Sequence, residues 1–186
     1  MKGVSVKSSP EMYELHPSEA RWFAVHTRSK SEKMVKRLLE KKQVEAYVPV
    51  QKHLRKYQRI KRWVELPLFN CYVFVRITQP QYVQVLETQH VVDFVRFGKT
   101  MIAIPESEID TIRRITLENG LDIVATPGHF AEGDPVEISA GGLTGLKGLI
   151  VRQEGKRKFQ VILNHFGMSL LISIDAAFLE KTGRNT

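Results

Sequence analysis

The sequence is poor in the residues and runs that would tie it to an oxidising compartment or a membrane. Its 186 residues include one cysteine, Cys71. These residues therefore allow no internal disulfide and no cysteine-rich metal site, which favours a reducing cytoplasm. Residues 1–19 lack the apolar core of a signal peptide, and no apolar run approaches the length of a membrane helix. The expectation is a soluble cytoplasmic protein.

Residue patterns typical of catalysis are missing too. The six histidines are scattered without a pair at helical ligand spacing, and the acidic residues form no obvious pair, so we expect no metal and no cofactor. Gly141–Gly148 superficially resembles a phosphate loop, but it lacks the Gly-Lys-Ser/Thr ending, and a tight turn between strands is the better interpretation. Bulky apolar neighbours predict a buried structural thiol at Cys71. The sequence predicts a protein that is not an enzyme.

Positive charge is abundant. Lys and Arg number 28 against 20 Asp and Glu, which gives a net charge of +8. Such an excess favours polyanionic partners without distinguishing DNA, RNA and anionic lipid. It is most concentrated in 51–62, where Tyr57 lies among the cations and Trp63 follows them. The cations of this segment are Lys52, Arg55, Lys56, Arg59, Lys61 and Arg62.

Two interpretations of this basic segment are open. Cations can neutralise phosphates and the aromatic rings can stack on exposed bases. Alternatively, the segment is a solvated hairpin whose charges only aid solubility. A second basic cluster, on the first predicted helix, favours nucleic-acid binding, with duplex and single strand both possible.

The first hundred residues after the tail alternate between strand and helix patterns. Apolar runs and helical spacing predict an α+β domain over 20–118, preceded by a flexible tail (1–19) and followed by a linker (119–128). Ser29 and Glu32 match a capping box at the start of the first helix. The predicted strands are 22–26, 46–50, 65–77 and 91–97. Three helices are predicted: one that begins after Ser29, one over 78–88, and one that begins at Pro105 and stops at Gly120.

Residues 129–186 have a different texture. They hold eight of the twelve glycines together with short alternating apolar segments, and no amphipathic helix of useful length. Short strands with glycine-rich turns predict a small all-β barrel. Because glycine and β-branched residues disfavour helix, we expect this barrel to be stable.

The strand pattern Pro67–Val75 lies directly behind the basic segment and is rich in aromatic residues. Alternation puts Tyr72 and Phe74 on one face and Cys71, Val73 and Val75 on the other. The pattern leaves open which face is outward. An apolar surface beside a basic strip indicates a protein that binds a protein partner and nucleic acid together.

The order of these segments resembles the NusG family. Trp22–His26, the basic helix, Tyr47-Val48-Pro49, Pro67–Val75 and Phe94–Gly98 are similar to its N-terminal (NGN) domain, an antiparallel sheet flanked by helices. Glu132–Val136, the glycines Gly141 and Gly148, and Phe166-Gly167 resemble its SH3-like KOW barrel. The resemblance runs from about Arg21 to Lys181. Three segments are more similar to the operon-specific paralogues of the RfaH and UpxY type than to the housekeeping factor. They are Val91–Gly98, Asp122-Ile123-Val124 and the extended basic hairpin.

The resemblance implies a transcription elongation or antitermination factor that acts as a monomer and suppresses pausing or termination. It further implies an operon-specific role, with surface or capsular polysaccharide operons as the expected targets. The implied partners are the clamp helices of the largest RNA polymerase subunit, the non-template DNA strand and nascent RNA. The residues expected to bind polymerase are His26, Phe69, Tyr72 and Phe74, and those expected to face the DNA on or beside the first helix are Arg28, Lys41 and Lys42.

For the barrel, the resemblance implies recruitment of a ribosomal protein or of termination factor Rho. The matching positions are Leu143, Leu146, His165, Phe166 and Met168. Leucine stands at the first two, where the housekeeping factor has aromatic residues, and Asn70-Cys71 stands where Pro-Gly or a close relative is usual. The alternative hypothesis is an RNA-binding, ribosome-associated KOW protein.

Overall fold

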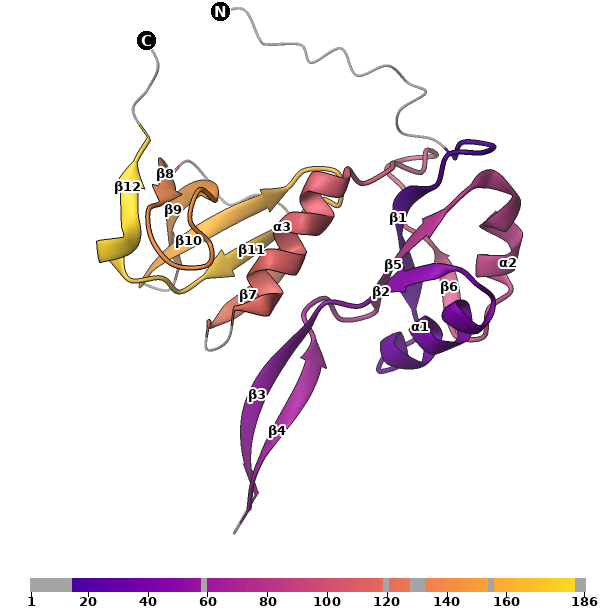
Figure 1. Cartoon of the computed structure of the whole chain (residues 1–186), viewed down its shortest axis with the longest axis horizontal. Helices are drawn as coiled ribbons and strands as arrows, with labels where there is room; N and C mark the ends of the chain where they lie inside the picture. The colour runs from indigo at the N-terminus through magenta and orange to yellow at the C-terminus, as the bar shows by residue number, and fades with distance from the viewer. Residues whose placement is uncertain (1–14, 58–59, 119–120, 128–132, 154–155, 183–186) are drawn as a thin grey trace, which may run out of the picture. The chain divides into compact units, whose positions relative to one another are not determined.

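The protein is described here from a computed structural model that covers residues 15–57, 60–118, 121–127, 133–153 and 156–182 (Figure 1). Most of the predicted tail and the predicted helix stop at Gly120 lie outside these ranges. The chain forms two compact units. The first comprises Met1–Val48 and Asn70–Pro105, and the second comprises Pro49–Phe69 and Glu106–Thr186. The predicted domain boundaries stay a prediction.

The first unit is an antiparallel sheet with helices, as an α+β domain requires. Its strands run in the order β2-β5-β1-β6, so the central pair is β5 and β1. The strands are β1 (Arg21–Thr27), β2 (Glu45–Tyr47), β5 (Tyr72–Ile77) and β6 (Val91–Phe94). The helices are α1 (Glu32–Lys41), the 3₁₀ turn η2 (Gln79–Gln81) and α2 (Tyr82–Leu86).

One face of this sheet packs against α2. Val25 lies opposite Phe94 in the β1–β6 register, and Phe23, two residues earlier on β1, shares that face. The ring of Tyr82 on α2 stacks on Phe94 at 4.9 Å between centroids, and Phe23 meets Phe94 edge-on at 6.4 Å. His26 and the residues that alternate with it along β1 therefore lie on the other face.

The predicted capping box is wrong. Helix α1 has Ser31, not Ser29, at its N-cap, and no side chain caps it. The Glu32 carboxylate instead accepts the backbone N–H of Cys71 at 2.6 Å, from a buried position. A partner distant in sequence thus replaces the local one, because the loop before β5 presents an N–H that the β-ladder does not use.

The predicted strand 65–77 is two strands in different sheets. β4 (Ile60–Pro67) pairs with β3 (Val50–Tyr57) in a two-stranded sheet, while β5 begins at Tyr72 in another sheet. Between them Cys71 has φ 66°, a left-handed conformation that breaks the extended chain. Cys71 is half-buried rather than buried as predicted, because it belongs to this turn and not to the strand.

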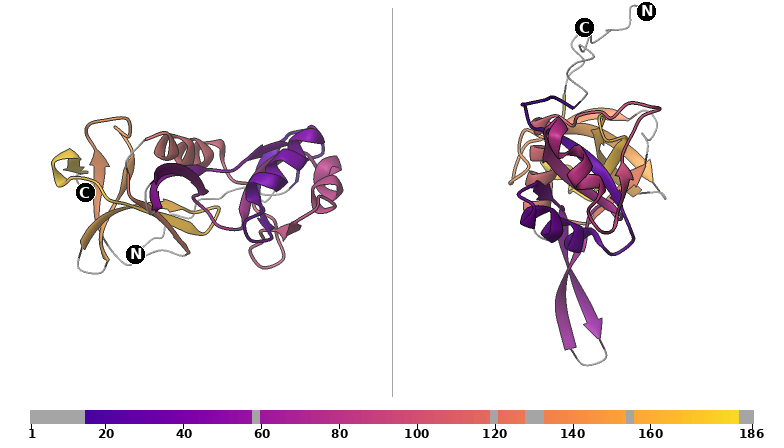
Figure 2. Two further views of the ribbon diagram at one scale, coloured as in Figure 1. Left: turned by 90° about the horizontal axis from the view of Figure 1, so that it is seen from below. Right: turned by 90° about the vertical axis from the view of Figure 1, so that its right-hand side faces the viewer.

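Among the described residues, the second unit contains helix α3, the β3–β4 hairpin and an antiparallel sheet, here called the C-terminal sheet, in the order β12-β8-β9-β10-β11-β7. Figure 2 shows the strands of this sheet from two further sides, mostly in orange and yellow. Residues expected in the linker supply β7, which pairs with β11. Gly148 lets β9 approach β10 closely, because a Cβ there would lie 2.4 Å from the carbonyl oxygen of Gln160. The elements are α3 (Glu106–Leu117), β7 (Ile123–Pro127), β8 (Asp134–Ile138), β9 (Lys147–Gln153), β10 (Lys156–Leu163), β11 (Met168–Ile172), the 3₁₀ turn η3 (Ala176–Phe178) and β12 (Leu179–Lys181).

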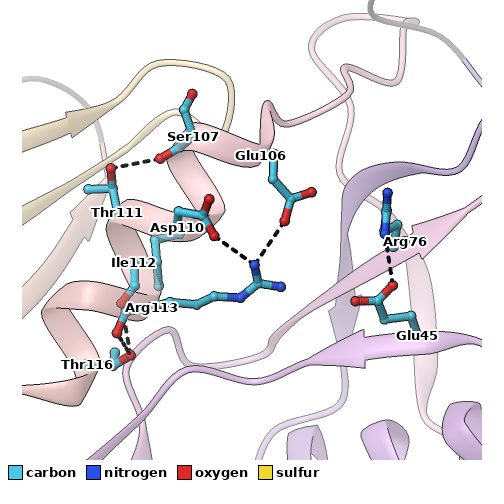
Figure 3. Close-up of polar contacts among 9 residues, drawn as sticks. All are labelled: Glu45, Arg76, Glu106, Ser107, Asp110, Thr111, Ile112, Arg113 and Thr116. Carbon is cyan, nitrogen blue, oxygen red and sulfur yellow. Dashed lines mark hydrogen bonds and ion pairs between the residues drawn. The ribbon is translucent and has the colours of Figure 1, made fainter.

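Helix α3 is held by ion pairs along its exposed side (Figure 3). Arg113 donates to Glu106 at 2.9 Å and to Asp110 at 2.8 Å. Its buried side carries Ile109, Ile112 and Ile115 at helical spacing. The structure confirms the predicted fold class, an α+β first part and an all-β second part. No helix of the described residues is long and apolar enough to cross a membrane.

Candidate functional site

The sheet face opposite α2 carries an aromatic patch. His26 on β1 lies directly across from Tyr72 on β5, with ring centroids 4.5 Å apart. The next cross-strand row holds Tyr47 and Phe74, whose centroids are 6.2 Å apart. His26, Tyr72 and Tyr47 are half-buried, whereas Phe74 is fully buried. The patch therefore has a buried phenylalanine as its floor and amphipathic rings at its surface, which suits contact with a protein.

Burial raises the pKa of the Tyr72 phenol above its ordinary value of 10.0, and Cys71 adds a smaller contribution in the same direction. The phenol therefore stays protonated at neutral pH and can act as a hydrogen-bond donor. Tyr47 also lies on this face, but the sequence did not single it out for binding. Its signal in the sequence is the Tyr47-Val48-Pro49 motif, which supports the family resemblance but did not mark Tyr47 as a binding residue.

Phe69, the fourth residue predicted to bind polymerase, lies in the second unit. It is buried and meets the ring of Phe166 edge-on, with centroids 5.1 Å apart. The structure thus places His26, Tyr72 and Phe74 on one face of the first unit's sheet.

The cations predicted to face DNA have unequal freedom. Arg28 and Lys41 are exposed. Lys42 is half-buried, and its ammonium donates to the Thr88 hydroxyl at 2.9 Å and to the Gln84 carbonyl oxygen at 3.1 Å. These bonds tie α1 to α2, so Lys42 has a structural role whatever else it does.

The β3–β4 hairpin displays both charge and apolar surface. Lys52, Lys61 and Arg62 are exposed, and Trp63 lies directly opposite Leu54 in the register. Leu54 was not predicted as a site residue, and only its pairing with Trp63 reveals it. Arg59 lies outside the described residues, as do the side chains of Arg55 and Lys56.

The apolar residues predicted to recruit a partner through the barrel are buried in this structure. They keep 4–8% of their surface exposed; they are Leu143, Leu146, Phe166 and Met168. His165 is half-buried and its Nδ1 lies 2.7 Å from a carboxylate oxygen of Glu108 on α3. The same oxygen accepts the backbone N–H of His165 at 3.2 Å.

A second contact joins α3 to the turn between β8 and β9. The Arg114 guanidinium donates to the carbonyl oxygen of Thr144 at 2.8 Å and, more weakly, to that of Gly142 at 3.4 Å. Gly142 leaves room for the Glu118 carboxylate, since a Cβ there would overlap it. Both turns that carry the predicted recruitment residues are thus attached to α3.

Within the described part of the chain, no three His, Cys, Asp or Glu side chains come together as they would around a metal ion. The exposed surfaces described above are aromatic, apolar and cationic.

Comparison with known proteins assigns a family to this arrangement. The family model described as "NusG: Transcription termination factor nusG" matches residues 20–113, about half of the 186 residues. Among solved structures, one described as "Domain interaction in Thermotoga maritima NusG" is 23% identical, covers 89% of this chain and 98% of its own, and superposes with a TM-score of 0.55. This likeness shows a shared fold.

A chain of the MjSpt4:Spt5 complex in conformation A is 21% identical and covers 88% of this chain and 99% of its own, but its TM-score of 0.29 is too low to indicate a common overall arrangement. No curated protein shows significant sequence similarity to this chain. Because the family model covers just over half of the chain, including the strands that carry the aromatic patch, the chain belongs to the NusG family.

Proposed function

We propose that this protein is a transcription elongation and antitermination factor that binds RNA polymerase through the aromatic patch and nucleic acid through its basic surfaces. The observation that carries the proposal is the His26–Tyr72 pair, two half-buried amphipathic rings in contact above the buried ring of Phe74. Aromatic residues of this kind are enriched in protein–protein hot spots. The clamp helices of the largest polymerase subunit are the proposed partner, in keeping with the family.

Exposed cations supply the second contact. Arg28 and Lys41, beside and on α1, and Lys52, Lys61 and Arg62 on the hairpin are all solvent-accessible. Their proposed ligands are the non-template DNA strand and nascent RNA. A factor bound to both polymerase and nucleic acid would bridge them. Such a bridge would disfavour the conformations of polymerase that pause or terminate.

The C-terminal sheet is proposed to recruit a ribosomal protein or Rho. Its proposed contact residues, Leu143, Leu146, Phe166 and Met168, are buried. Binding at those residues would therefore require the turns to separate from α3, which means breaking the Glu108–His165 and Arg114–Thr144 contacts. We propose that this separation accompanies engagement, and that the factor acts as a monomer on a restricted set of operons, such as those for surface polysaccharides.

A paused-elongation assay with purified polymerase tests the central proposal. The wild type should shorten a defined pause, and Tyr72→Ala and His26→Ala should each need about a tenfold higher concentration for the same effect, as expected for hot-spot residues. Val83→Ala removes an exposed side chain from α2 and serves as the matched control. Phe74 is a poor probe, because replacing a fully buried ring would destabilise the unit itself.

A wild type that neither binds polymerase nor changes pausing would end this proposal. The alternative, an RNA-binding and ribosome-associated KOW protein, then predicts co-sedimentation with ribosomes that depends on the basic hairpin and not on Tyr72. Restriction to particular operons is tested separately, by comparing templates with different promoter-proximal sequences.

A further inference from the structure

One face of the β3–β4 hairpin combines exposed apolar side chains with exposed charged ones. Because side chains alternate along a strand, Lys52 and Leu54 on β3 share a face with Lys61, Trp63 and Glu65 on β4. We call these five residues the Leu54–Trp63 face. All five are exposed, and the centre of the face is the directly opposed pair of Leu54 and Trp63.

The exposure of Trp63 is the key observation. Its side chain retains 66% of its surface and Leu54 retains 45%, whereas the other tryptophan, Trp22, retains 2%. A two-stranded sheet has no second layer against which to bury such a pair. Directly opposed residues have Cβ atoms about 5 Å apart, so the two side chains form one continuous apolar surface.

Charge surrounds this apolar surface asymmetrically. Lys61 lies two residues from Trp63 on the same face, about 7 Å along the strand. Arg62, the next residue, is exposed on the opposite face of the hairpin. At the other end Glu65 is opposite Lys52, so their charges offset one another. The positive potential is therefore greatest at the Lys61 end of the platform, next to the indole ring.

We propose that the Leu54–Trp63 face is a stacking platform for an unpaired base of single-stranded nucleic acid, with Lys61 contacting an adjoining phosphate. The flat indole ring can stack on a base of any sequence, and the cations supply the sequence-independent attraction to the backbone. This inference gives a ligand class to the hairpin and rests on the proposed function for its place in transcription.

A duplex fits the same face less well. A two-stranded ribbon can enter the major groove, but base edges are read there by polar side chains such as Asn, Gln and Arg. The centre of this face is apolar. A duplex keeps its base faces stacked on one another, so the indole ring would have no surface to cover. Unpaired bases offer that surface.

Tryptophan fluorescence measures the predicted contact directly. The full chain is titrated with a thymidine oligonucleotide of about twelve residues, within the usual range for single-strand sites. Stacking should quench the emission of Trp63, while the buried Trp22 should be unaffected. In Trp63→Phe the quenching should vanish, although binding detected by fluorescence anisotropy of a labelled oligonucleotide should persist with modest loss.

Affinity measurements give the size of the effect. Trp63→Ala should weaken binding of the thymidine oligonucleotide about tenfold, from the usual contribution of one stacked base. Phe178→Ala, which removes an exposed aromatic ring from the second unit, is the matched control and should change nothing. Lys61→Ala should weaken binding and reduce its salt dependence by about 0.7 in slope, the contribution of one phosphate contact on a single strand.

Three ligands of equal length test the chemistry. An abasic strand keeps the phosphates without the bases, so it should bind weakly, cause no quenching and be insensitive to Trp63→Ala. A duplex of mixed sequence should behave in the same way. A uridine oligonucleotide distinguishes an RNA source of the unpaired base from a DNA source, and tighter binding of either one identifies that source.

Equal quenching by the duplex or the abasic strand would overturn the platform, as would equal affinity of Trp63→Ala and Phe178→Ala for the thymidine oligonucleotide. This result is independent of the polymerase assay. If oligonucleotide binding depends on Trp63 and polymerase is not bound, the proposed function fails and the platform stands. If pausing changes without any effect of Trp63→Ala on oligonucleotides, the platform fails and the proposed function stands.

Discussion

The aromatic patch on the first unit and the turns of the C-terminal sheet were both expected to bind protein partners, yet they differ in how much of them is accessible. In the patch, His26 and Tyr72 are half-buried and only Phe74 is fully buried. In the turns, all four apolar candidates are buried, and the fifth residue, His165, contacts α3. The patch therefore keeps part of its rings exposed, whereas the apolar side chains of the turns are almost entirely buried.

This difference shows that an apolar residue can match a binding position of the family and still be buried in this protein. Leu143 and Phe166 have the composition of a binding surface and the burial of a core. Leu54 shows the opposite case, because the sequence did not predict it as a binding residue and its side chain is exposed. Three predictions, from the largest expected effect to the smallest, test how the two regions differ.

Phe166→Ala tests whether the turns of the C-terminal sheet are core. Phe166 is 4% exposed and packs edge-on against Phe69, so its truncation should lower the free energy of unfolding by about 3–5 kcal/mol. Urea unfolding followed by circular dichroism measures this loss. The matched control is Trp63→Ala, an exposed aromatic of the same unit, which should change the unfolding free energy by no more than about 0.5 kcal/mol. A loss below about 1 kcal/mol for Phe166→Ala would mean that the turn is a weakly held surface, ready to open.

Cys71→Gly should stabilise the entry to the strand that carries Tyr72. Cys71 has φ 66°, a conformation that costs an L-residue about 1–2 kcal/mol and glycine nothing. Part of that gain is offset by the greater chain entropy of glycine in the unfolded state, which leaves a net increase of about 0.5–1 kcal/mol in unfolding free energy. Thermal or urea denaturation measures it.

Cys71→Ala is the control for this substitution, because it removes the thiol and keeps the strained backbone. It should not stabilise the protein. Equal stability of the glycine and alanine variants would indicate that the Glu32 carboxylate, which accepts the Cys71 N–H, holds this turn without strain.

The smallest effect concerns the pH dependence of the patch. Burial raises the pKa of Tyr72 in the folded state above its ordinary value of 10.0, so the folded protein favours the neutral phenol. The resulting stability is fully present below that ordinary value and is lost as the pH rises through the raised one. The free energy of unfolding should therefore fall above pH 10 more steeply in the wild type than in Tyr72→Phe. Identical slopes for the two proteins would mean that the phenol is as solvated in the folded state as in the unfolded one.

Local patterns predicted much of the fold. The apolar run Trp22–His26 lies in strand β1, and the helical spacing of Val35 and Leu39 lies in α1. In the described part of the glycine-rich stretch 129–186, the regular elements are strands and η3. These features depend on neighbouring residues, so periodicity detects them. The errors lie where a distant residue decides. The capping box failed because Glu32 bonds to Cys71, and the strand predicted over 65–77 failed because the chain turns at Cys71 between two sheets.

The candidate sites divide along the same line. Alternation correctly put Tyr72 and Phe74 on one face, but only pairing with β1 placed His26 beside Tyr72 at 4.5 Å. Lys42 and Arg28 carry the same charge in the sequence, and only the packing of α1 near α2 gave Lys42 two hydrogen-bond acceptors. The sequence shows which side chains are charged, whereas the groups that bind those side chains in the folded protein depend on tertiary packing.

The sequence by itself determined the family, the two fold classes and the excess of positive charge, because each is a property of residue order or composition. The tertiary structure decided exposure. It buried the apolar turns of the C-terminal sheet, left Trp63 and Leu54 exposed opposite each other, and packed Phe69 against Phe166. The physical reason is that burial depends on which surfaces meet across long stretches of chain, and the same apolar side chain serves as core or as binding surface according to what lies opposite it.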